Sequence, residues 1–150
     1  MRSQIDQSLT YARRLFADTR HRWQAWNSLG RRGERAAERL LKRKGYLIVG
    51  RNVRNPFGEL DLIAVDNRTV VFVEVKSRRN ELENPAEAVT DEKQRRLTRA
   101  SLAFLKRNHL LEHSARFDVV AVVWPKNHRR PRLRHYVNAF EPVGTFQAFN

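Results

Sequence analysis

The chain of 150 residues is 41% hydrophobic, which is enough to bury one core, and its 30 Lys and Arg against 16 Asp and Glu give a net charge of +14. A basic excess of this size points to a polyanionic partner. The absence of cysteine excludes disulfides, zinc–thiolate fingers and cysteine nucleophiles, and no apolar run approaches membrane-spanning length. These features are consistent with a cytoplasmic protein that has no role in a membrane.

The first thirty residues predict a helical extension that precedes the main domain. Their apolar residues recur mostly at spacings of three, four or seven, at Ile5, Leu9, Phe16, Trp23 and Trp26. An amphipathic arm of this kind packs either on its own domain or on a second subunit, so a homodimer is one expectation. Residues 31–150 contain no Pro/Gly/Ser-rich linker and no internal repeat, and are expected to form one domain.

A helix is predicted to open at Gly33-Glu34 and to end at Lys44-Gly45, where glycine provides the stop. Glu34 then lies in the first turn, where a carboxylate complements the positive end of the helix dipole by up to about 1 kcal/mol. Glu38, one turn later, is a second acidic candidate. It can equally be a solvated partner of Lys42 at the i+4 position.

Two β-branched runs, Gly58 to Val65 and Thr69 to Lys76, are separated by a turn-type cluster and predict an antiparallel hairpin. The second run is apolar on both faces, which is typical of a central strand. Because side chains at i and i+2 share a face, Glu74 points the same way as Lys76. Ionised groups at the end of such a strand are costly unless they are paired or bind a metal.

For an isolated Glu-x-Lys, an ion pair of little energetic value is the commoner explanation. Here three features occur together: an acid at Asp61 on the first strand, Glu74 and Lys76 on the second, and the acidic helix start at Glu34 before both. This combination favours a metal-dependent site that cleaves phosphodiester bonds.

The remaining chain predicts a loop, a long helix and two further strands. Residues 77–85 lack periodicity and form either an ordinary connector or a loop that closes on substrate. Thr90 caps the helix, whose buried stripe is Leu97, Ser101, Phe104 and Leu105. Strands are expected at 116–124 and 132–140, and Asp118 is expected to pair with a basic neighbour rather than to act in catalysis.

Several of these motifs together resemble the YraN-type uncharacterised family of the PD-(D/E)XK nuclease superfamily, which is akin to the archaeal Holliday-junction resolvases. The resemblance covers about Arg31 to Trp124. Its motifs are Gly33, Gly45-Tyr46, Asn52, Arg54, Gly58-Glu59-Leu60-Asp61, Glu74-Val75-Lys76 and Arg116-Phe117-Asp118-Val119-Val120. It implies a restriction-endonuclease-like α/β fold, in which a mixed central sheet of about five strands is flanked by helices and preceded by the N-terminal helical extension.

The resemblance also implies roles for individual residues. Asp61 and Glu74 would bind Mg²⁺ or Mn²⁺, with the backbone carbonyl of Val75 as a further oxygen ligand. Lys76 would orient or help to deprotonate the attacking water, and Glu34 would complete the acidic shell. Leu60 stands where the superfamily usually has proline before the Asp, but the Asp itself is intact.

The basic residues near these motifs are expected to contact the phosphates of nucleic acid, most simply DNA, with strongly salt-dependent binding. The candidates are Arg31, Arg32, Arg35, Arg54, Arg78, Arg79, Lys93 and Arg96. A further basic cluster, 129–134, lies near the end of the chain. The competing explanation is a merely cationic surface, or attraction to an anionic membrane. For Lys93, solvation at the helix surface is the simpler expectation.

These observations predict a metal-dependent endonuclease acting on DNA. The idea of a branched or recombination-type substrate comes only from the resemblance to resolvases. Two alternatives stay open. One is a non-catalytic nucleic-acid-binding accessory protein that keeps the nuclease fold, and the other is RNA processing, for which the chain offers no recognition motif.

Overall fold

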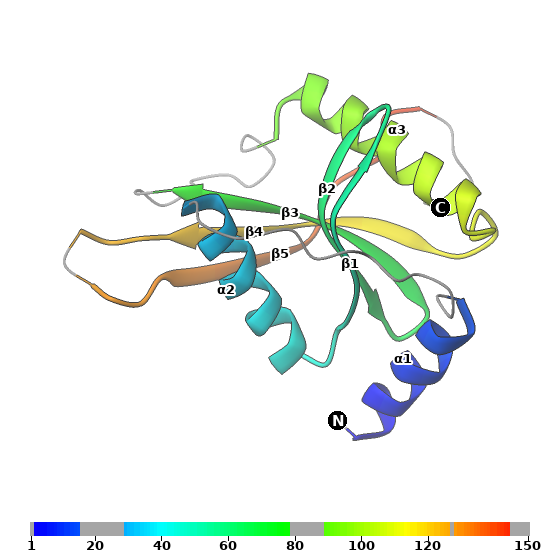
Figure 1. Ribbon diagram of the computed structural model, residues 1–150, viewed down its shortest axis with the longest axis horizontal. Coiled ribbons are helices and arrows are strands. Elements are labelled where there is room, and N and C mark those ends of the chain that lie inside the picture. Colours follow the sequence, from blue (N-terminus) through cyan, green and yellow to red (C-terminus); the bar gives the residue numbers. More distant parts are fainter. Residues whose placement is uncertain (1, 16–28, 79–88, 127, 145–150) are drawn as a thin grey trace.

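A computed structural model describes residues 2–15, 29–78, 89–126 and 128–144 of the chain. In this part of the chain the order of elements is α1 (Arg2–Leu15), α2 (Leu29–Arg43), β1 (Leu47–Asn55), β2 (Gly58–Asp66), β3 (Thr69–Arg78), α3 (Asp91–Arg107), β4 (Ala115–Val123) and β5 (Arg132–Phe140). The strands form one sheet, with α2 and α3 on opposite faces and α1 at one end (Figure 1). The predicted α/β class, with a mixed five-stranded sheet, is confirmed.

The strands follow one another in the sheet in the order β1-β2-β3-β4-β5. All neighbours are antiparallel except β3 and β4, which are parallel and are joined through α3. β3 is therefore the central strand, as its apolar sequence predicted. The hairpin of β2 and β3 is also confirmed, since Asp66 pairs with Thr69 across a two-residue turn in which Asn67 has a φ of 54°.

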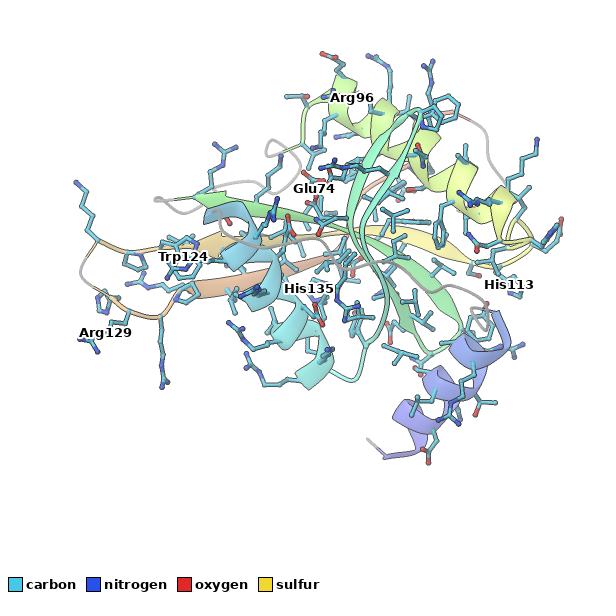
Figure 2. The ribbon with its side chains drawn as sticks, in the orientation of Figure 1. Glu74, Arg96, His113, Trp124, Arg129 and His135 are labelled. Atoms are coloured by element: carbon cyan, nitrogen blue, oxygen red, sulfur yellow. The ribbon has the colours of Figure 1, made fainter. Side chains whose placement is uncertain are left out.

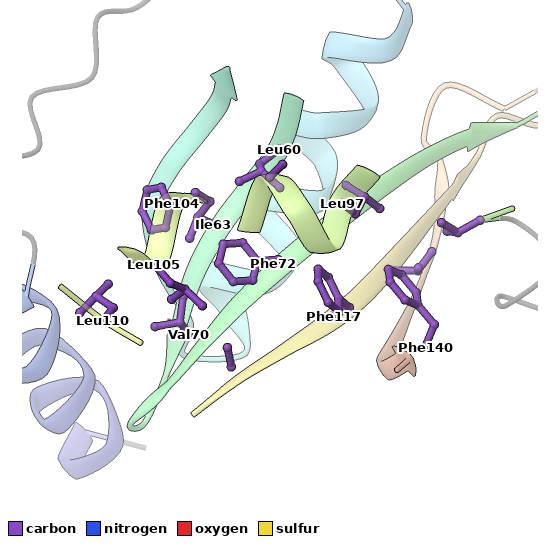
Figure 3. Close-up of a cluster of buried hydrophobic side chains, with 14 residues drawn as sticks. Leu60, Ile63, Val70, Phe72, Leu97, Phe104, Leu105, Leu110, Phe117 and Phe140 are labelled. Carbon is purple, nitrogen blue, oxygen red and sulfur yellow. The ribbon is translucent and has the colours of Figure 1, made fainter. Parts of the chain in front are cut away.

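Each face of the sheet has its own hydrophobic core. On the α3 face, the ring of Phe72 lies 5.9 Å from that of Phe104 and 5.8 Å from that of Phe117 (Figure 3). On the α2 face, small residues of the helix pack against Val71 and Val73 of β3. The central strand is thus covered on both sides, and its position is fixed by packing.

The predicted C-terminal end of α2 and the predicted start of α3 are confirmed. α2 ends in a Schellman motif, in which the N–H of Tyr46 donates to the carbonyl of Leu41 at 3.0 Å and that of Gly45 to the carbonyl of Lys42 at 3.0 Å. Gly45 has a φ of 89°, which explains the need for glycine. At the start of α3, Thr90 Oγ1 accepts a hydrogen bond from the N–H of Lys93 at 3.3 Å.

One expectation about the sheet and its loops was wrong, and one strand was not located from the sequence. Ser77 and Arg78 belong to β3 and not to the following loop, because β4 offers them parallel pairing partners up to Arg78 and Val123. Residues 79–85 of that predicted loop lie outside the described residues. β1, at Leu47–Asn55, fills the sheet to five strands at a place that the motif analysis had not assigned to a strand.

Helix α1 packs on its own domain, near the turn between β2 and β3. Ser8 is buried, and its hydroxyl accepts a hydrogen bond from the N–H of Asn67 at 3.1 Å. The hydroxyl of Tyr11 lies 2.6 Å from Nδ1 of His113. Phe16, Trp23 and Trp26 of the predicted arm lie outside the described residues. No helix in the described ranges is both long and apolar enough to cross a membrane.

The contact of α2 with β3 predicts the effect of a change at Gly33. A Cβ on Gly33 would overlap Ser77 Oγ and lie 3.3 Å from Ser77 Cβ, so Gly33→Ala should lower the free energy of unfolding by about 1–3 kcal/mol in chemical denaturation. Combining it with Ser77→Ala removes the overlapping atom and should recover part of the loss. The control is Gly30→Ala at an exposed position of the same helix, where alanine should be neutral or stabilising. Equal losses in both variants would contradict the packing argument.

Candidate active site

The end of the β2–β3 ladder brings Asp61 and Glu74 together. The paired residues of these strands end at Leu62 and Val73. Beyond them, Oδ2 of Asp61 accepts a hydrogen bond from the N–H of Val75 at 2.8 Å. The carboxylate thus takes the place of a strand partner, and it is held against the backbone of β3 beside Glu74.

Glu74 is the most deeply buried acid of this group, with 4% of its surface exposed. Its Oε1 lies 3.1 Å from Nζ of Lys76 and 3.1 Å from Nζ of Lys93, which comes from α3. Its Oε2 has no hydrogen-bond partner among the described residues. Glu74 lies at the centre of the molecule in Figure 2. It is unusual for a buried carboxylate to have one oxygen that accepts no hydrogen bond. Such an oxygen is a candidate ligand for a cation.

The pKa of Asp61 is raised well above its ordinary value. Burial is the largest cause, followed by the negative charge of Glu74, while the hydrogen bond from Val75 opposes both. Glu34 raises the pKa of Asp61 further, and Lys93 lowers it. Two ionised carboxylates repel each other in this confined space. A cation placed between them would relieve that repulsion.

Glu34 reaches the neighbourhood from α2, but not from its first turn as predicted, because the helix begins earlier, at Leu29. Its Oε2 accepts a hydrogen bond from Nδ2 of Asn52 at 2.9 Å. Burial raises the pKa of Glu34, the Asn52 hydrogen bond lowers it, and the charges of Glu59 and Glu74 raise it again. Glu34 is therefore part of the electrostatic surroundings of the acidic pair, with its orientation set by Asn52.

The oxygen donors at this site suit a hard divalent cation. Asp61 and Glu74 provide carboxylates, and the backbone carbonyl of Val75 follows directly. Within the described ranges, no group of three or more acidic or histidine side chains is arranged to hold an ion. Two carboxylates and a carbonyl are nevertheless compatible with Mg²⁺, which commonly keeps several waters and is bound through one or two carboxylates. Oε2 of Glu74, which has no hydrogen-bond partner among the described residues, is a ligand atom available to such an ion.

The candidate nucleic-acid contacts fall into different environments. Lys93 is only partly in solvent, with 33% of its side chain exposed, because its ammonium group also pairs with Glu74. Arg54 pairs with Glu59 at 3.1 Å, and the guanidinium of Arg32 lies over the ring of Trp124 at 4.6 Å. Arg35, Arg78 and Arg96 are exposed and Arg31 is half-buried. Arg79 lies outside the described residues.

Asn52 was not assigned a role at the site from the sequence, and Lys93 was expected to contact nucleic acid or solvent, without the contact to Glu74. Asn52 has a φ of 46° and orients Glu34, and asparagine is among the few side chains that tolerate this left-handed conformation. Lys93 was recognised as basic, but its pairing with Glu74 depends on how α3 crosses the sheet. An Asn in a strand is a weak sequence signal for the left-handed conformation of Asn52. The contact between Lys93 and Glu74 can be found only from the fold.

Asp118 has the structural role that the sequence predicted. It is fully buried, and accepts hydrogen bonds from Nε of Arg116 at 3.0 Å and from the N–H of Asn138 at 2.9 Å, with Nε2 of His135 2.8 Å away. Burial opposes its ionisation, but the hydrogen bonds from His135 and Arg116 hold the pKa of Asp118 below its usual range. The carboxylate joins β4 to β5, and the partners that hold it come from these two strands and not from the acidic pair.

Glu38 also proves to be structural. Its carboxylate accepts two hydrogen bonds from Arg51 of β1, at 2.6 and 2.9 Å, and lies 2.6 Å from Nζ of Lys42. The predicted i+4 pair is confirmed, and the pairing with Arg51 ties α2 to β1. Glu38 is therefore not available as an acid of the site.

Comparison with known proteins gives a family for the matched segment. A model described as the uncharacterised protein family UPF0102 matches residues 33–122, which include Glu34, Asp61, Glu74 and Lys76 but not α1. A UPF0102 protein of Rhodopirellula baltica is 49% identical over 120 residues, covering 77% of this chain and 72% of the relative. One of Geotalea uraniireducens is 49% identical over 115 residues, covering 76% and 90%. One of Desulfosudis oleivorans is 54% identical over 94 residues, covering 62% and 76%.

The Glu38 contacts predict a pH-dependent contribution to stability. Burial opposes ionisation, but hydrogen bonds from Arg51 and Lys42 lower the pKa of Glu38 from 4.5 to about 2. Because the pKa is depressed in the folded state, the stabilisation is present above 4.5 and is lost as the pH falls through about 2. Glu38→Gln should cost roughly 1–3 kcal/mol near neutral pH, and the difference from wild type should shrink in acid.

Chemical denaturation at several pH values measures this difference directly. The matched control is Glu112→Gln, an exposed carboxylate, for which the change should stay small at every pH. A constant difference between wild type and Glu38→Gln from neutral pH to strong acid would contradict the assignment of the ion pair.

Proposed function

Because this chain belongs to the YraN-type uncharacterised protein family UPF0102, a name that assigns no activity, we propose a function from the site itself: metal-dependent hydrolysis of phosphodiester bonds in DNA. One observation carries the proposal. Glu74 is buried, and one of its oxygens contacts two lysines while the other has no hydrogen-bond donor among the described residues. Its negative charge also raises the pKa of the neighbouring Asp61. Such an arrangement costs stability, so a function is its natural explanation.

Asp61, Glu74 and the carbonyl of Val75 would hold Mg²⁺ or Mn²⁺. A bound divalent cation supplies Lewis acidity toward phosphate oxygens and makes water a better nucleophile at neutral pH. The protein's part is to fix the two carboxylates. The Val75 N–H holds Asp61 in place, and the central position of β3 holds Glu74.

The two lysines would act on the phosphate. Lys76 and Lys93 place two ammonium groups at a single carboxylate oxygen, so their positive charge exceeds what that contact neutralises. A phosphodiester gains negative charge on its oxygens in the transition state, and ammonium groups fixed beforehand stabilise that charge without reorganising. Lys76, next to Glu74 on the same strand face, is also suited to orient the attacking water.

Glu34 would support proton transfer at the edge of the site. Its pKa is raised by burial, which brings it closer to the range in which a carboxyl group can both accept and release a proton. The hydrogen bond from Asn52 to Oε2 of Glu34 fixes the orientation of the carboxyl group and leaves Oε1 to exchange the proton. We assign Glu34 to this role and not to direct ion binding.

DNA is the proposed substrate because the chain carries a net charge of +14, with exposed arginines on α2, β3 and α3. Branched or recombination-type DNA is the more specific proposal, and its support is the resemblance to resolvases. A two-fold symmetric junction would suit a homodimer of this chain.

A non-catalytic role in nucleic-acid binding is the second candidate, and one observation favours it. Lys76 and Lys93 already neutralise Glu74, and in the described part of the chain no trio of acidic or histidine side chains forms a ready metal site. An accessory protein could keep such a site as a relic of the fold. Cleavage and metal binding separate the two candidates.

Cleavage assays test the proposed activity. Labelled four-way junctions, flaps, duplexes and single strands are incubated with Mg²⁺ or Mn²⁺, and Asp61→Ala, Glu74→Ala and Lys76→Ala should each lower the rate at least about 100-fold, as loss of a preorganised charge does. Lys93→Ala should reduce the rate less, because it leaves Lys76, the lysine proposed to orient the attacking water, in place at the same oxygen. The control is Lys106→Ala, which removes an exposed positive charge from the last turn of α3. Binding without cleavage under either ion would favour the accessory role.

Metal binding is tested without reference to activity. Added Mn²⁺ should raise the thermal unfolding temperature of the wild-type protein, because a ligand that binds only the folded state stabilises it by about 2.7 kcal/mol at 100 times its Kd. Asp61→Asn should abolish this rise and, in EDTA, should unfold no earlier than wild type because it removes repulsion from Glu74. Asp91→Asn, an exposed acid of α3, should keep the Mn²⁺ effect. An equal rise in all three proteins would exclude the Asp61 site.

A further inference from the structure

An aromatic side chain is exposed at the tip of the hairpin formed by β1 and β2. Phe57 has 47% of its surface accessible, although a phenyl ring gains free energy when it is covered. It occupies the two-residue turn between Asn55 and Gly58, which pair with each other at the ends of the two strands. Asp61 lies on β2 a short way beyond this turn. The ring therefore lies at the tip of the hairpin whose second strand carries Asp61.

The turn presents the ring in a fixed position. Pro56 precedes Phe57 and restricts the backbone to the φ value that the first corner of a tight turn requires. The N–H of Phe57 donates to Oδ1 of Asn55 at 3.0 Å, and Nδ2 of Asn55 donates to the carbonyl of Ala100 at 3.0 Å. The tip is thus anchored to α3, as the approach of this hairpin to the helix in Figure 1 also shows.

A basic flank of α3 connects this tip with the acidic pair. Lys93, Arg96 and Ala100 are three and four residues apart and lie on one side of the helix. Lys93 contacts Glu74 at one end, and Ala100 holds Asn55 at the other. Arg96, exposed on α3 (Figure 2), lies between them. Glu92, one turn before Arg96, is an exposed acidic residue of the same helix.

We propose that Phe57 and Arg96 bind an unpaired nucleotide of the DNA next to the active site. The phenyl ring stacks on the unpaired base, and the guanidinium contacts an adjoining phosphate. Aromatic rings beside basic side chains are the combination with which proteins hold single-stranded nucleic acid. This inference rests on the proposed function and deepens it, since it selects substrates with an unpaired base near the scissile bond over intact duplex.

Charge decides between nucleic acid and another copy of this chain as the occupant. A second copy would also carry a net charge of +14, so its approach through a surface containing Arg96 would be opposed by repulsion. A polyanion is attracted to the same surface. The bases of intact duplex are already stacked on their neighbours, whereas an unpaired base offers a free face to the ring.

Equilibrium binding in EDTA tests the inference independently of cleavage. At one fixed salt concentration, fluorescence anisotropy compares a fork that carries an unpaired arm with a blunt duplex of the same length. Phe57→Ala should weaken binding of the fork by about 5- to 150-fold, the range for losing one stacked base, and should change duplex binding less than about twofold. Phe57→Trp should bind the fork as wild type does. Arg96→Ala should weaken fork binding, and a titration repeated at several salt concentrations should show a smaller salt dependence than that of wild type.

The matched control is Val137→Ala, which removes an apolar side chain with 54% of its surface exposed on β5, at the other edge of the sheet. It should leave the binding of both DNAs unchanged. A 2-aminopurine placed at the unpaired position reports stacking directly: its fluorescence should fall when wild-type or Val137→Ala protein binds, and not when Phe57→Ala protein binds. This readout in the wild type remains informative even if one variant is poorly folded.

The other outcomes distinguish failure of this inference from failure of the proposed function. Equal binding of the fork by wild type and Phe57→Ala removes the nucleotide site and leaves the proposed nuclease standing. Failure of wild type to bind any DNA removes both. If Phe57→Ala changes only self-association in sedimentation velocity, the tip is an interface between copies. If fork selectivity depends on Phe57 but no metal supports cleavage, the nucleotide site stands and the enzymatic proposal fails.

Discussion

The pairing of Glu74 with two lysines is the interaction on which the arrangement of this molecule depends. A carboxylate with 4% of its surface exposed needs compensation, and it obtains that compensation from Lys76 on its own strand and Lys93 on α3. The contact with Lys93 joins the helix to the central strand at the point where the hydrophobic core gives way to polar groups. Removing either type of charge would leave the other uncompensated in a region of low dielectric constant.

Around this interaction the fold separates two kinds of polar cluster. Asp118 is completely satisfied, with hydrogen bonds from Arg116 and Asn138 and a contact with His135, and its pKa is depressed. Asp61 is incompletely compensated, and its pKa is raised. The surroundings of these two carboxylates thus shift their pKa values in opposite directions. A lowered pKa is typical of a carboxylate in a structural ion pair, and a raised pKa is typical of one that lacks a compensating cation.

The parts predicted correctly from the sequence are those that local rules decide. Alternation along β3 places Glu74 and Lys76 on one face, and Gly45 and Thr90 mark helix ends through backbone hydrogen bonds of their own neighbourhood. The start of α2 and the position of β1 were not foreseen. β1 contains a register shift between Ile48 and Gly50 and is half-buried along most of its length, so the alternation that reveals a strand is broken. The contacts made by Lys93 arise from tertiary packing.

The two kinds of strand connection around β3 also have a kinetic consequence. β2 and β3 are joined by a two-residue turn, so bringing Asp61 beside Glu74 requires the closure of only a short loop. β3 and β4 are parallel and are linked through α3, so their pairing joins distant residues and pays a larger entropy of loop closure. The two acids are therefore the early, local product of folding, and the ammonium group of Lys93 arrives with the late one. In a nascent chain, Lys76 on the same strand is thus the first positive charge to balance the acids, and the ammonium group of Lys93 follows with α3.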